Sequence, residues 1–358
     1  MAKLFERLAL RQVEFRNRIW VSPMCQYSSQ EGMPTDWHLV HYGSRAVGGA
    51  GMVFVEATAV APEGRISPDD LGIWSEAHTA PFQKIARFIK SQGAVAGIQL
   101  AHAGRKGSTA APWNGGRKVA VENGGWQPVA PSALPFAADY PQPRQMTKSD
   151  LDQAINDFRT AAQRSVAAGF EVIEVHVAHG YLCHQFLSPL SNARTDEWGG
   201  SLQNRMRFPL QVAQAVRETV PSNLPVFVRI SATDWAPGGW DLEQAIEFCK
   251  ALKKVGIDLI DVSSGGNVED AKVPLAPGFQ VPFAAAIREQ VAMPTATVGL
   301  ITEPQQAEDI LQQGKADAIL IGREFLRDPY FVLHAAQHLQ ATTDVPKQYA
   351  RAIQGPIR

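Results

Sequence analysis

Cysteine is scarce in this chain. Only three occur among 358 residues, as Cys25, Cys183 and Cys249, and no two of them have zinc-finger spacing. An odd number of widely separated thiols suits a reducing compartment and argues against a disulfide framework. With 45% hydrophobic residues, a chain of this length can bury a large core, which excludes a disordered protein and a small disulfide-stapled one.

Long hydrophobic runs and an excess of one charge are also missing. The most apolar early stretch, Ala46–Ala61, contains Glu56 and is too short to span a bilayer. The N-terminal MAKLFERLAL lacks the apolar region and cleavage site of a signal peptide. Lys and Arg number 34 against 35 Asp and Glu, so electrostatics give no reason to expect a nucleic-acid partner. We therefore expect a soluble cytoplasmic protein.

A G-x-G-x-x-G turn after an early strand is absent as well, which argues against a doubly wound sheet. What the chain does contain is a series of short apolar runs, rich in Val and Ile, as in parallel strands buried on both faces. Eight of them are predicted strands: Ile19–Ser22, Met52–Ala57, Val95–Leu100, Glu171–His176, Val226–Ile230, Leu259–Ser263, Thr295–Val298 and Ala318–Ile321.

Amphipathic segments alternate with these runs. Apolar residues at three- and four-residue steps predict helices over Leu151–Ala168, Asp241–Val255, Pro304–Gln313 and Phe325–Leu339. Plausible N-caps are Thr147, Asp241 and Thr302, and glycines that suit a helix C-terminus are Gly169, Gly256 and Gly314. Eight strands, most followed by a helix, predict a (β/α)8 TIM barrel, with the doubly wound sheet as the alternative.

Two long segments interrupt the regular alternation. Residues 103–147 follow the third predicted strand, and residues 177–202 follow the fourth. Both begin at the carboxyl end of a strand, the face on which barrels carry their active sites. Loops of this length are usually functional or disordered.

The last two strands end in a pattern that suits a phosphate group. Gly299 follows the seventh strand, Gly322 and Arg323 follow the eighth, and Thr302 and Arg323 lie near helix starts. Glycine lets the backbone approach a phosphate, a helix N-terminus supplies free N–H groups, and Arg adds a two-pronged contact. We predict a phosphate site here; the alternative is that the glycines only form tight turns.

The fourth strand ends in His176, His179 and Tyr181. Gly180 favours a curl that would bring both imidazoles together, where two N–H donors could stabilise charge developing on a carbonyl oxygen. Tyr181 could then donate a proton, an effect worth ~10²–10⁴-fold in rate. A metal site that includes His184 and a pair of satisfied core histidines are the alternatives.

The first and third strands also end in candidate ligand contacts. Cys25 lies in the segment Ser22–Tyr27 and could contact a ligand ring, act as a nucleophile, or be an inert buried thiol. Gln99 offers both a donor and an acceptor, which is the pairing that a flat heterocyclic imide needs.

Arg229 is unusual for a barrel interior, because burying an uncompensated guanidinium is costly. It should face an anion or an electron-rich ligand, or else form an internal ion pair with Asp234 or Glu174. The sixth strand ends in Asp261–Ser264 and carries no lysine, which excludes a Schiff-base aldolase.

Six motifs then occur in a familiar order: SPMCQY at 22–27, VEATAV at 55–60, IQLAHAGRK at 98–106, HVAHGYL at 176–182, LSPLSNARTDEWGGSLQNRMRF at 187–208 and IGREFLRDP at 321–329. Together they resemble the Old Yellow Enzyme family of FMN-dependent ene-reductases, and most closely its thermophilic-like class, which includes xenobiotic reductases. The resemblance extends from about Leu4 to Arg351, and the string at 187–208 is highly specific.

The resemblance implies a barrel over residues 1–340 with non-covalent FMN at its carboxyl-end mouth and no metal ion. Its implied cofactor-binding residues are Ser22, Pro23, Met24, Cys25, Ala57, Gln99, Arg229, Gly299, Gly322 and Arg323. Arg229 would favour the negative charge of the reduced flavin, and Cys25 would tune its redox potential and contact substrate.

The resemblance also implies a ping-pong reaction. NADPH, or NADH, leaves a hydride on FMN and departs, and an alkene activated by a carbonyl or nitro group then receives it at the β-carbon. His176 and His179 would bind the activating oxygen, Tyr181 would protonate the α-carbon, and Tyr27 would be a second substrate contact. The missing dinucleotide motif agrees with a nicotinamide that shares the substrate pocket.

We expect a homodimer or homotetramer, since members of this class often end in an Arg that crosses into a neighbouring active site. Arg351 has the matching local context, but seven residues follow it, so Arg358 is the alternative within the predicted tail 341–358. The loop 107–130, with Trp113 and Trp126, is longer than in the shortest members and is expected to cover the site.

Three other functions remain open at this point. One is a different FMN barrel, such as one that oxidises dihydroorotate or a 2-hydroxy acid. The second is a zinc-dependent hydrolase on the same barrel, and the third is a non-catalytic binding protein. The set of two histidines and a tyrosine argues against the first.

Overall fold

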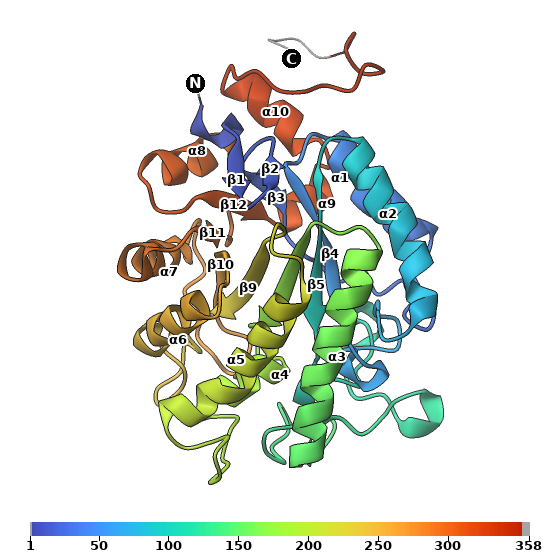
Figure 1. The fold of residues 1–358 in the computed structure, drawn as a ribbon, viewed down its shortest axis with the longest axis vertical. Helices are drawn as coiled ribbons and strands as arrows, with labels where there is room; N and C mark the ends of the chain where they lie inside the picture. The colour runs from blue at the N-terminus through green and yellow to red at the C-terminus, as the bar shows by residue number, and fades with distance from the viewer. Residues whose placement is uncertain (1, 353–358) are drawn as a thin grey trace.

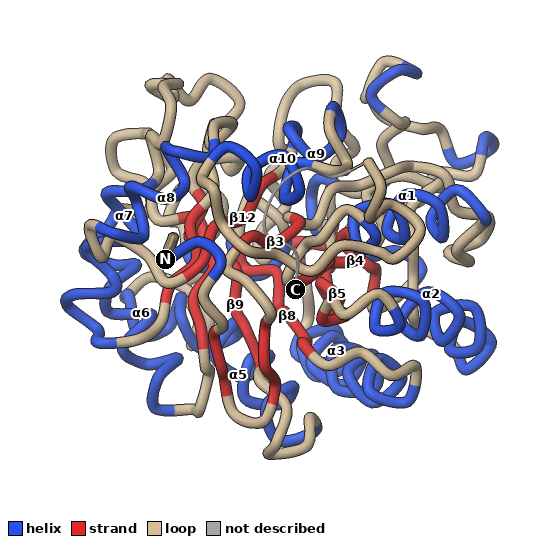
Figure 2. The backbone as a smooth tube through the Cα atoms, turned by 90° about the horizontal axis from the view of Figure 1, so that it is seen from above, coloured by secondary structure: helices blue, strands red, loops and turns tan. Residues whose placement is uncertain are grey.

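Eight parallel strands close into a barrel in the computed structural model, which describes residues 2–352. Around the barrel the order is β10 (Leu259–Ser263), β11 (Thr295–Thr297), β12 (Ala318–Ile321), β3 (Ile19–Val21), β4 (Met52–Ala59), β5 (Val95–Ala101), β8 (Val172–Val177) and β9 (Val226–Ser231). These are the eight predicted strands, and their ends lie within two residues of the predicted ones. The predicted (β/α)8 barrel is confirmed, and Figure 2 shows the strands enclosed by helices.

Ten α-helices of the described chain lie mainly around the barrel (Figure 1). They are α1 (Asp36–Val47), α2 (Thr79–Ser91), α3 (Lys148–Ala167), α4 (Leu182–Leu187), α5 (Leu202–Thr219), α6 (Leu242–Lys254), α7 (Val281–Ile287), α8 (Pro304–Gln312), α9 (Arg323–Arg327) and α10 (Phe331–His338). No helix within residues 2–352 is long and apolar enough to cross a membrane.

The predicted helix ends are mostly confirmed. The side chains of Thr147 and Asp241 accept hydrogen bonds from backbone N–H groups three residues later, as N-caps do. Gly169, Gly256 and Gly314 all have positive φ after their helices. Thr302 was expected as an N-cap and is not one, because Glu303 occupies that position before Pro304.

The single helix predicted over Phe325–Leu339 is wrong. The structure divides it into α9 and α10 at Asp328–Tyr330. Pro329 has no N–H and disfavours a helical conformation in the residue before it, and Asp328 is extended, with φ −130° and ψ 94°. The apolar pattern continues across the break because both helices bury one face.

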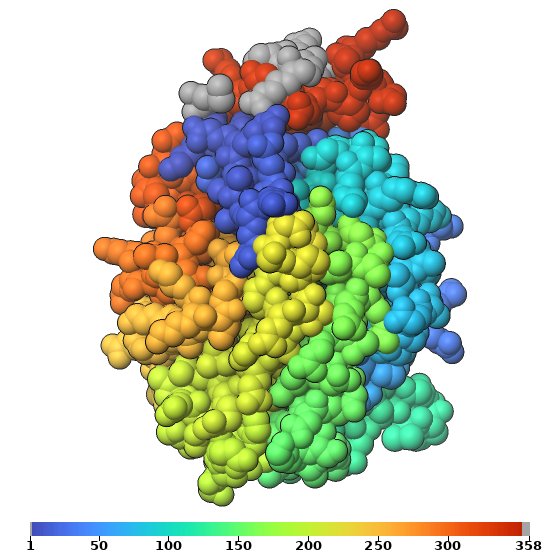
Figure 3. Space-filling model, viewed as in Figure 1, coloured from blue at the N-terminus to red at the C-terminus, as the bar shows by residue number. Residues whose placement is uncertain are grey.

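A short hairpin covers the end of the barrel at which the strands begin. It consists of β1 (Leu8–Leu10) and β2 (Val13–Phe15), which are too short for the sequence pattern to have predicted. Phe15 packs on Trp20 with ring centroids 4.7 Å apart, and Trp20 packs on Phe227 at 5.9 Å. In Figure 3 the first and last parts of the described chain, blue and red, lie at this same end of the molecule.

The loops at the opposite end carry only small elements. They include the pair β6 (Val129–Ala130) and β7 (Arg144–Gln145), and the short 3₁₀ turns Pro62–Gly64, Glu76–His78, Gly104–Lys106, Pro112–Asn114 and Val121–Asn123. At the other end lies the turn Lys3–Phe5, and α7 continues as a π-helical turn over Arg288–Ala292. The long segments after β5 and β8 therefore gather over the carboxyl ends of the strands, as predicted.

Candidate active site

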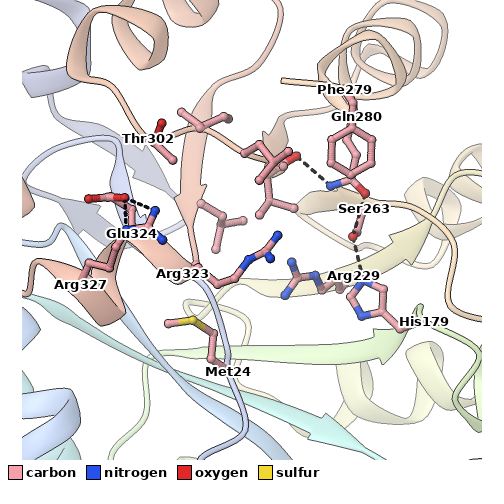
Figure 4. Close-up of a pocket in the computed structure, with 16 residues that line it drawn as sticks. Met24, His179, Arg229, Ser263, Phe279, Gln280, Thr302, Arg323, Glu324 and Arg327 are labelled. Carbon is pink, nitrogen blue, oxygen red and sulfur yellow. Dashed lines mark hydrogen bonds and ion pairs between the residues drawn. The ribbon is translucent and has the colours of Figure 1, made fainter. Parts of the chain in front are cut away.

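A cavity of about 430 Å³ opens at the carboxyl ends of the strands. Six of the predicted site residues line it: Met24, His179, Arg229, Gly299, Gly322 and Arg323. The sequence analysis had not assigned Ser263, Phe279, Gln280 or Arg327, which also line it. Figure 4 shows Arg229 from β9 and Arg323 from the start of α9 extending into the same space. The volume is that of a small-molecule or cofactor site.

One end of this cavity suits an anionic group. Gly299 has φ +127°, and a Cβ there would lie 2.9 Å from Gln280 Nε2, so the position requires glycine. Arg323 begins α9 directly after Gly322. Glu324 forms an ion pair with Arg327, so these two charges offset each other. Within residues 2–352 no such partner engages the Arg323 guanidinium, which leaves its charge for a ligand.

The turn after β8 brings the three predicted rings together. His179 and Gly180 have φ of 57° and 71°, so the strand curls instead of continuing. The ring centroid of His176 lies 5.2 Å from that of His179 and 5.1 Å from that of Tyr181. At Gly180 a Cβ would lie 2.3 Å from the carbonyl oxygen of Gly266, which explains the glycine. The predicted convergence of both imidazoles and the phenol is what the structure shows.

Both imidazoles are neutral near pH 7. Burial, followed by the charge of Arg229, lowers the pKa of His176 and of His179 well below its usual value. The Ala178 N–H donates to His176 Nδ1 at 3.3 Å, so the proton of that ring lies on Nε2. His179 Nε2 lies 2.7 Å from Ser263 Oγ, which leaves its Nδ1 for a ligand.

Tyr181 and Lys106 form the next part of the site. Burial raises the pKa of Tyr181 well above its usual value, so the phenol keeps its proton. Lys106 Nζ lies 5.2 Å from the Tyr181 ring centroid and donates to the carbonyl oxygens of His179 and Gly266 at 3.0 and 2.9 Å. Burial lowers the pKa of Lys106 to about 8. Lys106 lies in one of the quoted motifs, but the sequence analysis gave it no role.

His184 supports this turn from behind. Its Nδ1 accepts the Gly180 N–H at 2.9 Å, and its Nε2 lies 3.0 Å from Asp234. A metal site with His184 as a third ligand therefore lacks its geometry. In the described part of the chain, no three His, Cys, Asp or Glu side chains are placed to hold a metal ion.

Arg229 forms its ion pair with a residue that the sequence analysis had not considered. Its Nε lies 3.2 Å from Asp261 Oδ2, and its Nη1 donates to Ser22 Oγ at 3.1 Å. The expected internal partners, Asp234 and Glu174, were wrong. Asp234 binds His184, and Glu174 accepts a hydrogen bond from Gln99 Nε2 at 2.7 Å.

The segment after β3 contains Pro23, Met24, Cys25 and Tyr27, all half-buried, and Met24 lines the cavity. Burial raises the pKa of the Cys25 thiol, so the neutral thiol dominates near pH 7 and nucleophilic use is disfavoured. Its neighbour Gln26 donates its backbone N–H to Glu56 Oε1 at 2.9 Å. Tyr27 contacts the exposed Trp113 edge-on, with ring centroids 5.5 Å apart.

Ala57 and Arg351 complete the predicted set. Ala57 lines a small recess beside the cavity, and Tyr181 lines the same recess. Arg351 is exposed and follows Tyr349, which contacts Tyr330 just before α10. Within one chain that tail lies near the β1–β2 hairpin, away from the cavity (Figure 1). The alternative residue, Arg358, lies outside the described residues.

These residues fit FMN. Gly299, Gly322 and the unpartnered Arg323 suit its phosphate. The Arg229 guanidinium lines the cavity, so its charge can serve a ligand there although its Nε is paired with Asp261. One N–H of the Gln99 amide is taken by Glu174, which leaves its second N–H and its oxygen for an imide edge.

Known proteins of similar sequence and structure share flavin and nicotinamide chemistry. A model of the NADH:flavin oxidoreductase / NADH oxidase family matches residues 3–342. An NADPH dehydrogenase of Geobacillus sp. (strain WCH70) is 47% identical over 350 residues, covering 97% of this chain and 98% of the relative. One of Listeria innocua is 48% identical over 354 residues, covering 98% and 99%.

Solved structures agree with this match. The old yellow enzyme homologue from Zymomonas mobilis has a TM-score of 0.78 at 27% identity, covering 97% of this chain and 96% of that one. Morphinone reductase in complex with tetrahydroNAD has a TM-score of 0.78 at 26% identity, covering 99% and 97%. The chain therefore belongs to the NADH:flavin oxidoreductase / NADH oxidase family, that of the Old Yellow Enzymes, and is an FMN-dependent oxidoreductase that uses a nicotinamide cofactor.

Proposed function

We propose that this enzyme is an NAD(P)H-dependent ene-reductase that reduces carbon–carbon double bonds activated by a carbonyl or nitro group. The observation that carries the proposal is the cluster of two neutral imidazoles and one protonated phenol, with ring centroids 5.1 and 5.2 Å apart, at the cavity that suits FMN. FMN bound in this cavity would supply the hydride chemistry that links the nicotinamide to the alkene.

The protein's own groups account for the rest of the reaction. His176 and His179 bind the activating oxygen, and their N–H groups stabilise the negative charge that develops on it. Because both rings are neutral, they polarise this oxygen without protonating it in the ground state. Tyr181 donates its proton to the α-carbon, and its high pKa keeps that proton in place until a carbanion-like centre forms.

A nicotinamide that uses the same cavity agrees with the missing dinucleotide motif. The solved complex of morphinone reductase with tetrahydroNAD supports this reading by analogy. NADPH is the proposed donor, because the curated relatives are NADPH dehydrogenases.

Anaerobic stopped-flow spectroscopy on the purified protein tests the proposal. NADPH is expected to bleach the flavin, and 2-cyclohexenone, a maleimide or a nitroalkene is expected to restore its absorbance. Cyclohexanone, which lacks the double bond, is the control and is expected to leave the flavin reduced. A panel in which no activated alkene reoxidises the flavin would refute ene-reductase activity while leaving the family assignment intact.

We also propose a homo-oligomer in which Arg351 reaches the active site of a neighbouring subunit and contacts substrate. The exposure of Arg351 supports this arrangement, as does the position of the C-terminal segment at the end of the barrel opposite the long loops (Figure 1). Sedimentation gives the oligomeric state, and Arg351→Ala is expected to raise KM for alkenes without changing flavin content. An unchanged KM in a confirmed oligomer would remove Arg351 from the site.

A further inference from the structure

Two carboxyl groups lie together inside the barrel, beside the floor of the cavity. Glu174 on β8 and Asp261 on β10 are both fully buried, on the two strands that flank β9 in the barrel. The strand between them, β9, contributes Arg229, which lies beside Asp261 in the strand register. The two acids are fully buried, whereas Arg229, which is 5% exposed, also lines the cavity.

The carboxyl oxygens of this pair are short of hydrogen-bond donors. Glu174 Oε2 and both carboxyl oxygens of Asp261 accept no hydrogen bond from any N–H or O–H group of the described chain. A proton held between the two acids satisfies these oxygens, and two adjacent buried carboxyl groups cannot both ionise. Burial and the charge of Asp261 raise the pKa of Glu174, so Glu174 is the neutral acid. Asp261 carries the negative charge and faces Arg229 at 3.2 Å.

The groups that face the pair contribute no further net charge. Gln99 on β5 and Phe227 on β9 lie beside Glu174 in register, and Ala296 on β11 lies beside Asp261. His176, two residues beyond Glu174 on the same strand, is neutral. The net charge of the cluster is therefore close to zero while Asp261 is ionised and Glu174 is protonated.

Both residues that suit the imide edge of the flavin are held from behind by this pair. Gln99 donates to Glu174 Oε1 at 2.7 Å, and Arg229 is paired with Asp261. We propose that Glu174 and Asp261 act as positioning residues that share one proton, orient Gln99 and Arg229, and set the reduction potential of the bound flavin. The proposal rests on FMN occupying this cavity and does not depend on which alkene is reduced.

The physical basis is the charge of Arg229 that remains available to the cofactor. Asp261 offsets part of that charge, which limits how strongly Arg229 favours the negative charge added on reduction. Replacing Asp261 by a neutral residue removes this offset and should raise the potential. Removing the proton of Glu174 adds a second negative charge and should lower it.

Redox titration of the FMN-loaded protein from pH 6 to 10 tests this role, with Asp261→Asn and Glu174→Gln as variants. Asp261→Asn should shift the ratio of reduced to oxidised flavin at fixed ambient potential at least tenfold, which is about 30 mV for two electrons. Glu174→Gln can still accept from Gln99 and donate to Asp261 but cannot titrate. It should keep a near-native potential at pH 7 and lose the additional fall that the wild type shows at alkaline pH.

Glu308→Gln is the matched control. Glu308 is also a buried carboxyl group, but it lies on α8 and accepts the backbone N–H groups of Lys3 and Leu4. Its replacement should leave the potential unchanged. An FMN-loaded Asp261→Asn variant with the wild-type potential, or a Glu174→Gln variant with the wild-type alkaline response, would overturn the proposal. If Asp261→Asn does not fold, Glu174→Gln alone decides, and a wild type that binds no FMN would refute the function instead.

Discussion

The barrel interior has two layers of opposite character, only two residues apart along the same strands. On three neighbouring strands, an apolar side chain is followed two residues later by an ionisable one. The pairs are Val172 and Glu174 on β8, Phe227 and Arg229 on β9, and Leu259 and Asp261 on β10. The lower layer stabilises the fold by burying apolar area. The upper layer costs desolvation energy that ion pairing only partly offsets. The comparison shows that one layer of interior side chains stabilises this barrel and that the next layer, two residues further along each strand, serves its chemistry.

The largest expected effect comes from the catalytic group above the upper layer. Tyr181→Phe removes the proton donor and should slow flavin reoxidation by an activated alkene by ~10²–10⁴-fold. Flavin reduction by NADPH needs no proton from this group and should change little, as should the melting temperature. Stopped-flow measurement of the two half-reactions checks this. Equal slowing of both would contradict the assigned role.

The lower layer should give the reverse pattern. Phe227→Ala removes a fully buried ring that packs against Phe15, Trp20 and Phe54, and should cost about 3–5 kcal/mol of unfolding free energy. Chemical denaturation checks the loss, with Phe227→Leu as the milder control. The flavin potential of the protein that remains folded should stay at its wild-type value. A shifted potential would mean that the two layers are coupled.

Another buried acid, Glu56, sharpens the comparison because the basic side chain beside it, His38 at 3.9 Å, is kept neutral at pH 7 by burial, which lowers its pKa to about 4. Burial raises the pKa of Glu56 from 4.5 to about 8, although Glu56 accepts from the Gln26 N–H and the Tyr42 hydroxyl. The folded state therefore holds a proton that the unfolded state releases. The contribution of this proton to the free energy of unfolding is fully present below pH 4.5. It is lost as the pH rises to 8, by up to about 1.4 kcal/mol per pH unit.

Glu56→Gln should abolish this loss. Denaturation at pH 5 and pH 8.5 measures the free energy of unfolding of both proteins. Relative to the wild type, the variant should be more stable at pH 8.5 than at pH 5, by more than about 1 kcal/mol. Parallel pH profiles for the two proteins would show that Glu56 is already ionised in the folded state.

The smallest expected effect lies outside both layers, in the loop 107–130. Trp113 is 67% exposed and contacts Tyr27 at the mouth of the site. Trp113→Ala should raise KM for bulky aromatic alkenes about fivefold, since an aromatic pair contributes about 1 kcal/mol, and should leave kcat within twofold. Trp113→Phe keeps the edge contact and is the control. An unchanged KM would place the bulky group elsewhere.

The sequence predicts the barrel well because buried parallel strands need continuous Val and Ile runs, which are visible locally. The pairing of Arg229 with Asp261 could not be found in this way. The sequence analysis offered Asp234 or Glu174 as the alternative ion-pair partners, whereas the true partner depends on the register of β9 against β10. Counting by two along the strands would have placed Glu174, Arg229 and Asp261 on one face.

The cluster of rings after β8 was predictable for a different reason. Gly180 signals the curl, and a curl at a strand end makes nearby side chains converge. Lys106 was missed because its partners are the backbone oxygens of His179 and Gly266, which no side-chain pattern reveals. The break before α10 was missed although Pro329 marked it, because the apolar periodicity is regular on both sides.

The β1–β2 hairpin gives the barrel a closed base, with Phe15 and Trp20 filling the axis below the ionisable groups. In the described chain Arg229, which is paired with Asp261, lines the cavity at the opposite end, and we expect protons and water to reach the two acids from that side. A cofactor bound in the cavity would block this route. Exchange of the shared proton with bulk solvent should then be slow while the cofactor is bound, so the electrostatic setting of the site is preserved from one turnover to the next.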